Sequence, residues 1–301
     1  MSSVTVLALI EAMAAKLEAA GLSFSDGFGQ GTTNAFDEAA WLVMWKLGLP
    51  LDDLASVENK PVAPADITQV AMLFDERISS RRPAAYLTNE AWLMGVPFYV
   101  DERVIIPRSF IAELLIDESI DPWLGEHTRR VLDLCTGNGS LAVLAAMTYP
   151  EVMVDAADIS TDALAVARIN IDRHQLADRI TLIESDGLAA CRGAQNGGYD
   201  LILCNPPYVN AASMAALPAE FRAEPALALA GNMHGGSDGM DFIRSLFLNA
   251  ATQMNENAVL VLEIGNEREN FERAFPQLEP LWFETSAGSD QVMLLTREQL
   301  I

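Results

Sequence analysis

The sequence predicts an α/β protein built on a doubly wound, mostly parallel sheet of seven strands, with a small helical domain before it. Three observations indicate this fold. From Arg130 onward, short apolar strand-like runs alternate with helical patterns, as in a parallel sheet covered by helices. The first 82 residues show helical periodicity instead. The last two strand-like runs are separated only by a turn at Gly288, so one strand should be antiparallel.

The composition is strongly acidic. The 301 residues include 19 Lys and Arg against 42 Asp and Glu, which gives a formal net charge of −23 at pH 7. This balance excludes a general phosphate-binding surface, because a nucleic acid would be repelled. A strongly basic protein partner would be attracted instead. We therefore expect no direct nucleic-acid binding.

The cysteines and histidines indicate neither a disulfide framework nor a metal site. The three cysteines lack C-x-x-C spacing, and the three histidines match no metal-ligand pattern. No apolar run approaches the roughly 18 residues that span a bilayer. The apolar N-terminal stretch is interrupted by Glu11 and has no basic residue before it, which favours an amphipathic helix over a signal peptide. We expect a cytoplasmic protein with no membrane segment and no metal.

Residues 1–82 are predicted to form the helical domain. Its first helix should end near Gly21, and a glycine-rich stretch around 27–31 follows. Asn34 is a good N-cap for the second helix, and Pro64 marks the start of the third.

Residues 83–120 have a different character. Aromatic and β-branched residues broken at Gly95 predict a β-hairpin, and a short linker helix should follow it. Residues 121–301 then form the sheet domain. Its strands are expected at 131–135, 152–159, 180–185, 201–204, 258–265, 281–287 and 291–298.

The first three strands of the sheet domain end in a pattern that suits a nucleoside ligand. Gly137 and Gly139 let the chain turn tightly and approach a ligand closely. Asp158 ends the second strand 19 residues after Gly139, where a carboxylate accepts hydrogen bonds from both ribose hydroxyls. Asp186 ends the third strand at the same edge and could accept a hydrogen bond from an adenine amino group.

A glycine turn of this kind also occurs for purely structural reasons, and Cys135 stands where many such sites have a first glycine. The acids at the ends of the next two strands favour the ligand-binding interpretation. The full G-x-G-x-x-G spacing is absent, which favours S-adenosylmethionine over a dinucleotide such as NAD.

The fourth strand leads directly into Asn205-Pro206-Pro207-Tyr208. Prolines fix φ and remove backbone donors, so the segment should be stiff and rich in acceptors. Asn205 offers a side-chain carbonyl, Pro206 a backbone carbonyl and Tyr208 an aromatic face, which together suit a planar NH₂ group. The alternative is an ordinary turn, because Pro-Pro ends strands in many proteins.

This cradle would solve a definite chemical problem. An amide or exocyclic amine nitrogen is a poor nucleophile, because its lone pair is delocalised. Two acceptors that draw the hydrogens out of plane concentrate the lone pair on the opposite face, where a sulfonium methyl could lie. The rate gain would come from orientation and fixed dipoles, without a charged base.

The motifs DLCTGNG, DIS, SDG and NPPY, in this order, resemble those of the N5-glutamine methyltransferases. This resemblance implies a Rossmann-like class I methyltransferase fold for 121–301, substrate recognition by 1–82, and conversion of S-adenosylmethionine to S-adenosylhomocysteine. NPPY is shared with amino-methyltransferases of DNA adenine, so it indicates the acceptor group and not the substrate.

The N-terminal half narrows the resemblance. GTTNAFDEA, AYLTNEAW, FYVDERVIIPRS and the cysteine-containing CTGNG turn look like the branch that acts on ribosomal protein L-three. The sister branch acts on peptide-chain release factors and has glycine where this chain has Cys135. The implied partner is a cationic ribosomal protein, met before or during ribosome assembly.

The resemblance also implies roles for individual residues. The cofactor would be held by Thr136, Gly137, Gly139, Asp158, Ile159, Asp186, Gly187 and Asn205. The target glutamine would be bound by Asn205, Pro206, Pro207 and Tyr208, of which Asn205, Pro206 and Tyr208 would be catalytic.

Two further residues allow two interpretations each. Arg108 could lie against the cofactor or the mouth of the active site, or it could link the domains. Glu263 could face the cleft, but we expect it to seat the helix that follows its strand.

Other functions remain as alternatives at this stage. The release-factor enzyme is the nearest. A DNA or RNA adenine methyltransferase should carry a basic target-recognition region, and none is visible between Asn210 and Gly231. A noncatalytic S-adenosylmethionine-binding scaffold is disfavoured by the intact NPPY motif.

Overall fold

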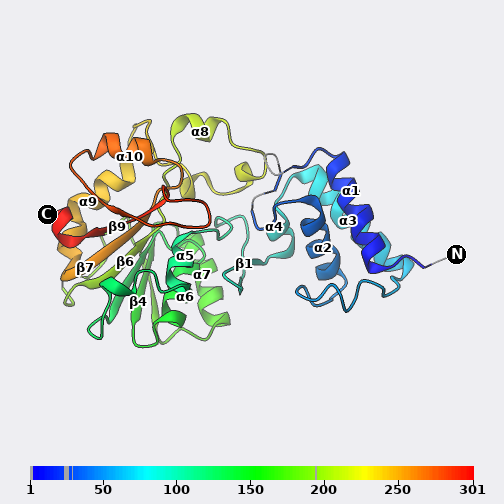
Figure 1. The fold of residues 1–301 in the computed structure, drawn as a ribbon, viewed down its shortest axis with the longest axis horizontal. Helices are drawn as coiled ribbons and strands as arrows, with labels where there is room; N and C mark the ends of the chain where they lie inside the picture. The colour runs from blue at the N-terminus through cyan, green and yellow to red at the C-terminus, as the bar shows by residue number, and fades with distance from the viewer. Residues whose placement is uncertain (1–2, 24–26, 29, 194) are drawn as a thin grey trace. The chain divides into compact units, whose positions relative to one another are not determined.

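The computed structural model describes residues 3–23, 27–28, 30–193 and 195–301. They form two compact units (Figure 1). The helical unit comprises Met1–Ala91 together with Leu217–Glu224, and the sheet unit comprises Trp92–Ala216 and Pro225–Ile301. The chain thus returns to the helical unit for eight residues in the middle of the sheet unit.

Three helices agree with the prediction: α1 (Val6–Ala19) ends near Gly21, α2 (Ala35–Lys46) follows Asn34, and α3 (Pro64–Ser80) begins at Pro64. The short helix α4 (Ala84–Thr88) was not predicted, because its residues belong to the stretch that was expected to form the hairpin. Asn34 Oδ1 accepts a hydrogen bond from Asp37 N at 2.9 Å, which confirms the predicted cap of α2. Pro64 is the first residue of α3, where its missing N–H costs nothing.

The core of the helical unit is apolar, and α1, α2 and α3 each contribute to it. Ile10, Leu42 and Phe74 are completely buried in it. Of the glycine-rich stretch predicted around 27–31, residue 29 lies outside the described residues. Phe28 from this stretch is packed into the same core.

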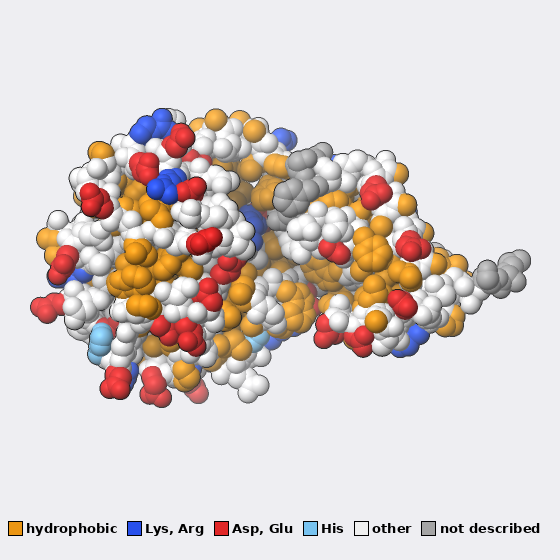
Figure 2. Space-filling model, viewed as in Figure 1, with side chains coloured by type: hydrophobic (Ala, Val, Ile, Leu, Met, Phe, Trp, Pro, Cys, Tyr) orange, Lys and Arg blue, Asp and Glu red, His pale blue; other side chains and the backbone are white. Residues whose placement is uncertain are grey.

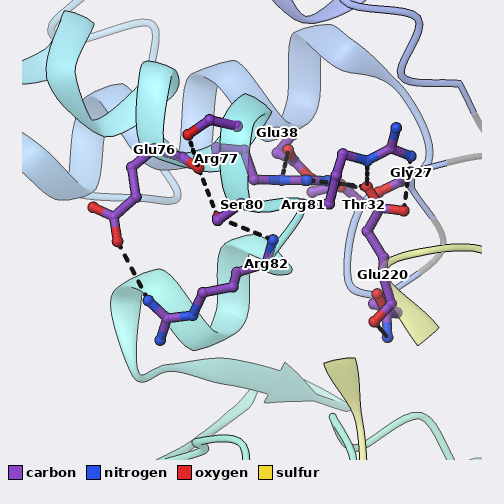
Figure 3. A network of polar contacts seen from close by, with 11 residues as sticks. Gly27, Thr32, Glu38, Glu76, Arg77, Ser80, Arg81, Arg82 and Glu220 are labelled. Carbon is purple, nitrogen blue, oxygen red and sulfur yellow. Dashed lines mark hydrogen bonds and ion pairs between the residues drawn. The ribbon is translucent and has the colours of Figure 1, made fainter. Parts of the chain in front are cut away.

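A buried charge cluster also lies in the helical unit (Figure 3). The Arg77 side chain is fully buried, and its guanidinium donates to Glu38 Oε1 at 2.8 Å, to Glu220 Oε1 at 3.1 Å and to the Gly27 carbonyl at 2.7 Å. Arg81 donates to both oxygens of Glu220. We call Glu38, Arg77, Arg81 and Glu220 the Arg77 cluster.

The Arg77 cluster holds the returning segment Leu217–Glu224 in the helical unit. Burial acts to raise the pKa of Glu220, but the hydrogen bonds from Arg81 and Arg77 outweigh it and lower that pKa overall. Burial dominates at Glu38 and raises its pKa. Two arginines face two glutamates, so the charges of the cluster balance and its desolvation is compensated.

The predicted hairpin is present in the structure. Its strands are β1 (Ala91–Leu93) and β2 (Val96–Phe98), joined by Met94 and Gly95. Both turn residues have positive φ, 51° and 77°, as a type I′ turn requires. The linker helix that follows is α5 (Ile111–Ile116).

The sheet unit contains the predicted seven-stranded sheet, in the order β5-β4-β3-β6-β7-β9-β8. Pairing is parallel from β5 to β7, while β9 is antiparallel to both of its neighbours. The strands are β3 (Arg130–Leu134), β4 (Met153–Asp158), β5 (Ile180–Glu184), β6 (Tyr199–Cys204), β7 (Met254–Glu263), β8 (Leu281–Trp282) and β9 (Val292–Thr296). The α/β fold class is confirmed, although β8 is much shorter than predicted.

Helices cover both faces of the sheet. Figure 1 shows α5, α6 (Ser140–Thr148) and α7 (Thr161–Arg173) on one face, with α9 (Asp241–Gln253) and α10 (Arg268–Ala274) on the other. Each face has its own apolar core. The short helix α8 (Ala211–Ala215) and the 3-10 turns η1 (Asp121–Trp123), η2 (Phe221–Ala223), η3 (Ala226–Ala228) and η4 (Arg297–Leu300) complete the elements.

The strand order creates a switch point between β3 and β6. From β3 the chain proceeds outward to β4 and β5 in one direction, and then returns to β6 and β7 on the other side. Ligands of doubly wound sheets bind outside the carboxyl ends of the strands at such a point. Among the described residues, no helix is long and apolar enough to cross a membrane.

We expect Glu220→Gln to destabilise the helical unit by about 3 kcal/mol, because it leaves two buried or half-buried guanidinium groups without their shared carboxylate. Urea unfolding measures this cost. Glu76→Gln is the matched control, since Glu76 pairs with Arg82 at the surface and such pairs contribute about 1 kcal/mol or less. Equal costs for the two variants would contradict the prediction.

Candidate active site

A pocket opens at the carboxyl ends of β3, β4, β5 and β6. Most of the predicted site residues line it: Thr136, Gly137, Asp158, Ile159, Asp186, Gly187, Asn205 and Pro207. Gly139, Pro206 and Tyr208 do not line this pocket, although all three belong to its supporting loops. The sequence therefore predicted residues that the fold brings together from four separate strands.

The turn after β3 has an unusual backbone. Cys135, Gly137 and Gly139 all have positive φ, at 63°, 55° and 81°. The left-handed conformation of Cys135 explains why glycine would be the ordinary residue there, since a side chain in this region costs about 1–2 kcal/mol. Gly139 is required by space as well, because an added Cβ would lie 3.1 Å from the Ala167 side chain of α7.

Asp158 at the end of β4 is fixed by backbone amides. One carboxylate oxygen accepts from Gly137 N at 2.9 Å, and the other accepts from Ser160 N at 2.9 Å. Burial raises the pKa of Asp158 and these hydrogen bonds oppose that shift. Because a carboxylate oxygen can accept more than one hydrogen bond, Asp158 keeps acceptor capacity toward the pocket.

Asp133 and Asn138 are two polar residues that the sequence reasoning missed. Asp133 is fully buried in β3, and it accepts hydrogen bonds from Thr136 Oγ1 at 2.5 Å and from Ala142 N at 3.0 Å. Asn138 lines the pocket, and its buried amide nitrogen has no partner among the described residues. Both lie within the DLCTGNG motif, but the sequence analysis assigned no role to either residue.

A segment after the hairpin supplies another wall of the pocket. Pro107, Arg108 and Ser109 line it. Arg108 therefore lies at the predicted site, as the first of its two interpretations has it. Its guanidinium donates to the Ile106 carbonyl at 3.1 Å. Leu227 and Met233 also line the pocket, and both side chains are substantially exposed. No sequence pattern singled out these two apolar residues.

The loop after β6, residues 205–210, is called the acceptor loop here. Pro206 and Pro207 are buried, whereas Asn205 and Tyr208 are half-buried. The far end of the loop is fixed by Val209, which exchanges backbone hydrogen bonds with Leu229 and Gly231 at 2.9 and 3.0 Å.

Glu263 does not play the role expected from the sequence. Its carboxylate accepts from Ser109 Oγ at 2.6 Å and from Phe110 N at 2.9 Å, so it contacts the segment that begins α5 and not the helix after its own strand. Burial raises the pKa of Glu263 to about 7. The Tyr208 hydroxyl lies 3.5 Å from its other oxygen.

Comparison with known proteins identifies the family. A family model described as "Methyltransferase small domain" matches residues 112–233. A ribosomal protein uL3 glutamine methyltransferase of Bordetella pertussis is 50% identical over 298 residues, covering 98% of this chain and 96% of the relative. Relatives of the same name in Burkholderia pseudomallei and Neisseria gonorrhoeae are 50% and 48% identical, each covering 91% of this chain and 89% of the relative.

The chain belongs to the uL3 glutamine methyltransferase family. The family resemblance predicted from the motifs is thereby confirmed, and the chain is a methyltransferase. Among solved structures, the human Mettl16 catalytic domain in complex with a MAT2A 3′UTR hairpin is 14% identical, covers 77% of this chain and 80% of its own, and has a TM-score of 0.49. A ribosomal protein L11 methylase of Lactobacillus delbrueckii is 19% identical, covers 62% and 76%, and has a TM-score of 0.42.

The site of this chain includes buried acids. Among the residues described, no group of three or more His, Cys, Asp or Glu side chains could hold a metal ion. Burial raises the pKa of Asp133 to about 7, although the hydrogen bonds from Thr136 and Ala142 oppose the shift. The folded protein therefore holds a proton on Asp133 at pH values where the unfolded chain does not.

This difference predicts a pH dependence of stability. Because the pKa of Asp133 is about 3.8 in the unfolded chain and about 7 when folded, its contribution is fully present below about pH 4 and is lost as the pH rises through 7. We expect Asp133→Asn to reduce the gain in unfolding free energy between pH 8 and pH 5 by about 1–4 kcal/mol.

Urea unfolding at both pH values measures this change. General charge repulsion also weakens on acidification, so the comparison between variant and wild type carries the result. Asp162→Asn, which removes an exposed carboxylate from α7, should leave the pH dependence as in the wild type. An unchanged pH dependence in Asp133→Asn would show that this carboxyl group does not retain its proton on folding.

Proposed function

We propose that this chain transfers a methyl group from S-adenosylmethionine to the side-chain amide nitrogen of a glutamine in ribosomal protein uL3. The observation that carries the proposal is the 50% identity with a uL3 glutamine methyltransferase over nearly the full length of both chains. The acceptor loop supports the chemistry, since it presents amide and carbonyl oxygens next to the pocket. The release-factor alternative is not favoured by the named relatives.

The pocket suits S-adenosylmethionine on its own geometry. Asp158 would accept hydrogen bonds from the ribose hydroxyls. The Asn138 amide nitrogen, which has no hydrogen-bond partner among the described residues, would offer a donor. Asp186 and Gly187 at the end of β5 would contact the adenine, and the Thr136–Gly137 turn approaches from β3. When bound, the cofactor supplies a methyl group made electrophilic by its sulfonium sulfur.

The residues of the acceptor loop would orient the glutamine amide. The Asn205 side-chain oxygen and the Pro206 carbonyl would accept its two hydrogens, and the Tyr208 ring would lie against its plane. As the nitrogen forms its new bond, these dipoles favour lone-pair density on the side that faces the pocket. Asn205 is a neutral amide and would not take up a proton. The methylated nitrogen would release one of its hydrogens to water as a proton, so no charged base is required.

The charge of the chain agrees with a basic substrate. Acidic side chains are spread over both units on the face shown in Figure 2, and the net charge is −23. Such a surface attracts a cationic ribosomal protein and repels RNA. We therefore propose that residues 1–82 help to recognise free uL3, before or during ribosome assembly, and that the enzyme makes no direct contact with nucleic acid.

A methyl-transfer assay with labelled S-adenosylmethionine tests the function. Free uL3, a peptide-chain release factor, duplex DNA and assembled large ribosomal subunits are compared, and the product is mapped by mass spectrometry. We expect label on a glutamine of free uL3 alone. Label on the release factor would overturn the substrate, label on DNA would overturn the substrate class, and label on assembled subunits but not free uL3 would overturn the proposed timing.

Asn205→Ala tests the acceptor cradle. We expect kcat to fall by about 10²–10³-fold, because one of two fixed acceptors is removed at the reacting nitrogen. The Kd for S-adenosylmethionine, measured by calorimetry, should rise by less than about tenfold, because the other residues predicted to hold the cofactor remain in the pocket. Asn249→Ala, on the exposed face of α9, is the matched control and should retain wild-type turnover. Near wild-type turnover in Asn205→Ala would rule out the cradle.

A further inference from the structure

The acceptor loop has little backbone hydrogen bonding of its own. Pro206 and Pro207 have no N–H groups, so the middle of the loop donates no backbone hydrogen bonds. Val209 is paired with Leu229 and Gly231 on one side of the loop. Further contacts come from the turn between β7 and α10, residues 263–267, which we call the 263–267 turn.

The first contact joins Glu263 and Tyr208. The carboxylate of Glu263 is only 2% exposed, and one of its oxygens is held at 2.6 and 2.9 Å by Ser109 and Phe110. Its other oxygen is the acceptor for the Tyr208 hydroxyl, at the long distance of 3.5 Å. Glu263 therefore connects the pocket wall at Ser109 with the aromatic residue of the acceptor loop.

The second contact is steric. Gly265 has a φ of +52°, and a Cβ added to it would lie 2.6 Å from Cε2 of the Tyr208 ring and 3.1 Å from its hydroxyl oxygen. Real Cβ atoms do not approach other atoms so closely. Only a glycine at this position lets the Tyr208 ring lie directly on the backbone of the 263–267 turn.

The third contact fixes the end of the acceptor loop. Glu267 Oε1 accepts from the Asn210 side-chain nitrogen at 2.6 Å and from Asn210 N at 3.4 Å. The Asn210 side-chain oxygen in turn accepts from Ala212 N and Ser213 N, each at 3.0 Å, and caps α8. The Asn210 side chain thus makes hydrogen bonds through both its nitrogen and its oxygen, and Glu267 connects it to the 263–267 turn.

We propose that the 263–267 turn positions the acceptor loop, and that Glu263 is the positioning residue that sets the orientation of the Tyr208 ring. Glu263 acts through Tyr208 and does not touch the target. Because the same carboxylate holds Ser109 in the pocket wall, it fixes the acceptor side and the cofactor side of the site relative to each other. The proposal rests on the methyltransferase function proposed above.

A double-mutant cycle tests the role of Glu263. Glu263→Leu introduces an apolar side chain of similar size that accepts no hydrogen bond. We expect this variant to have a kcat about three- to tenfold lower than the wild type. Tyr208→Phe should lower kcat by a similar factor, and the double variant should be no slower than the slower single variant. Glu263→Gln keeps one oxygen to accept from Ser109 and Phe110, and its amide N–H can donate to the Tyr208 hydroxyl oxygen, so it should recover most of the activity. The KM for S-adenosylmethionine should stay within about twofold in Tyr208→Phe, and it should rise in the variants with Leu at position 263, which lose the hydrogen bond to Ser109 in the pocket wall.

Ser109→Ala separates two effects of Glu263, the orientation of Tyr208 and the support of the segment that begins α5. It removes a hydrogen bond to Glu263 without touching Tyr208, so its effect should combine additively with that of Tyr208→Phe. If Glu263→Leu also combines additively with Tyr208→Phe, Glu263 only supports α5 and the proposal is wrong.

Gly265→Ala tests the contact between the 263–267 turn and the Tyr208 ring independently of Glu263. It provides a second test in case Glu263→Leu does not fold. We expect a loss of kcat, because the added methyl displaces the Tyr208 ring. Gly288→Ala is its control, since Gly288 also has positive φ but no atom lies within 4 Å of the added methyl. Equal effects on kcat would attribute the loss to backbone strain and overturn the steric contact.

Failure of the positioning role of Glu263 can be distinguished from failure of the proposed methyltransferase function. A wild-type protein that does not methylate uL3 overturns the function alone. Urea unfolding of the four proteins of the cycle measures the coupling between Tyr208 and Glu263 without substrate. Additive unfolding free energies would overturn the positioning role whether or not uL3 is methylated.

Discussion

The parallel pairing of β3 with β6 is the constraint on which the site depends. Leu134 lies beside Cys204 in this pairing, so the glycine turn after β3 and the acceptor loop after β6 leave the sheet at the same edge. Nearly 70 residues separate them in the chain. Neither loop forms a site by itself: the first has Asp158 as its anchor on β4, and the second rests on the turn after β7. The register of the sheet sets the distance between the two halves of the reaction.

Buried carboxylates stabilise this edge in different ways. Asp133 and Glu263 end or nearly end their strands, and each accepts hydrogen bonds from the start of a helix or the turn before it. Both have a raised pKa because burial outweighs these bonds. In the helical unit, Glu220 has the opposite shift, since two arginines surround it. Among these three carboxylates, only the one that accepts hydrogen bonds from two arginines has a lowered pKa.

Sequence reasoning succeeded where a local rule applies. The N-cap at Asn34, the helix start at Pro64, the turn of the hairpin and the acid Asp158 at the end of its strand all follow from short-range chemistry. It failed where a residue's role depends on a partner distant in the chain. Glu263 was expected to seat its own helix, but its hydrogen-bond donors lie about 150 residues earlier. Leu227 and Met233 become pocket residues only once the sheet has assembled, and no motif marks them. Asn138 lies in the glycine turn that signalled the pocket, but its buried amide nitrogen could be recognised only in the folded structure.

The return of Leu217–Glu224 to the helical unit has a consequence for synthesis of the chain. The guanidinium of Arg77 is made early, but its carboxylate partner Glu220 is translated more than 140 residues later. The helical unit cannot complete its core charge pairing as an autonomous N-terminal module, because β3 to β6 are made before Glu220 emerges. Its final structure forms only after most of the sheet has been synthesised, and a fragment ending at Ala91 would expose Arg77 unneutralised by that partner.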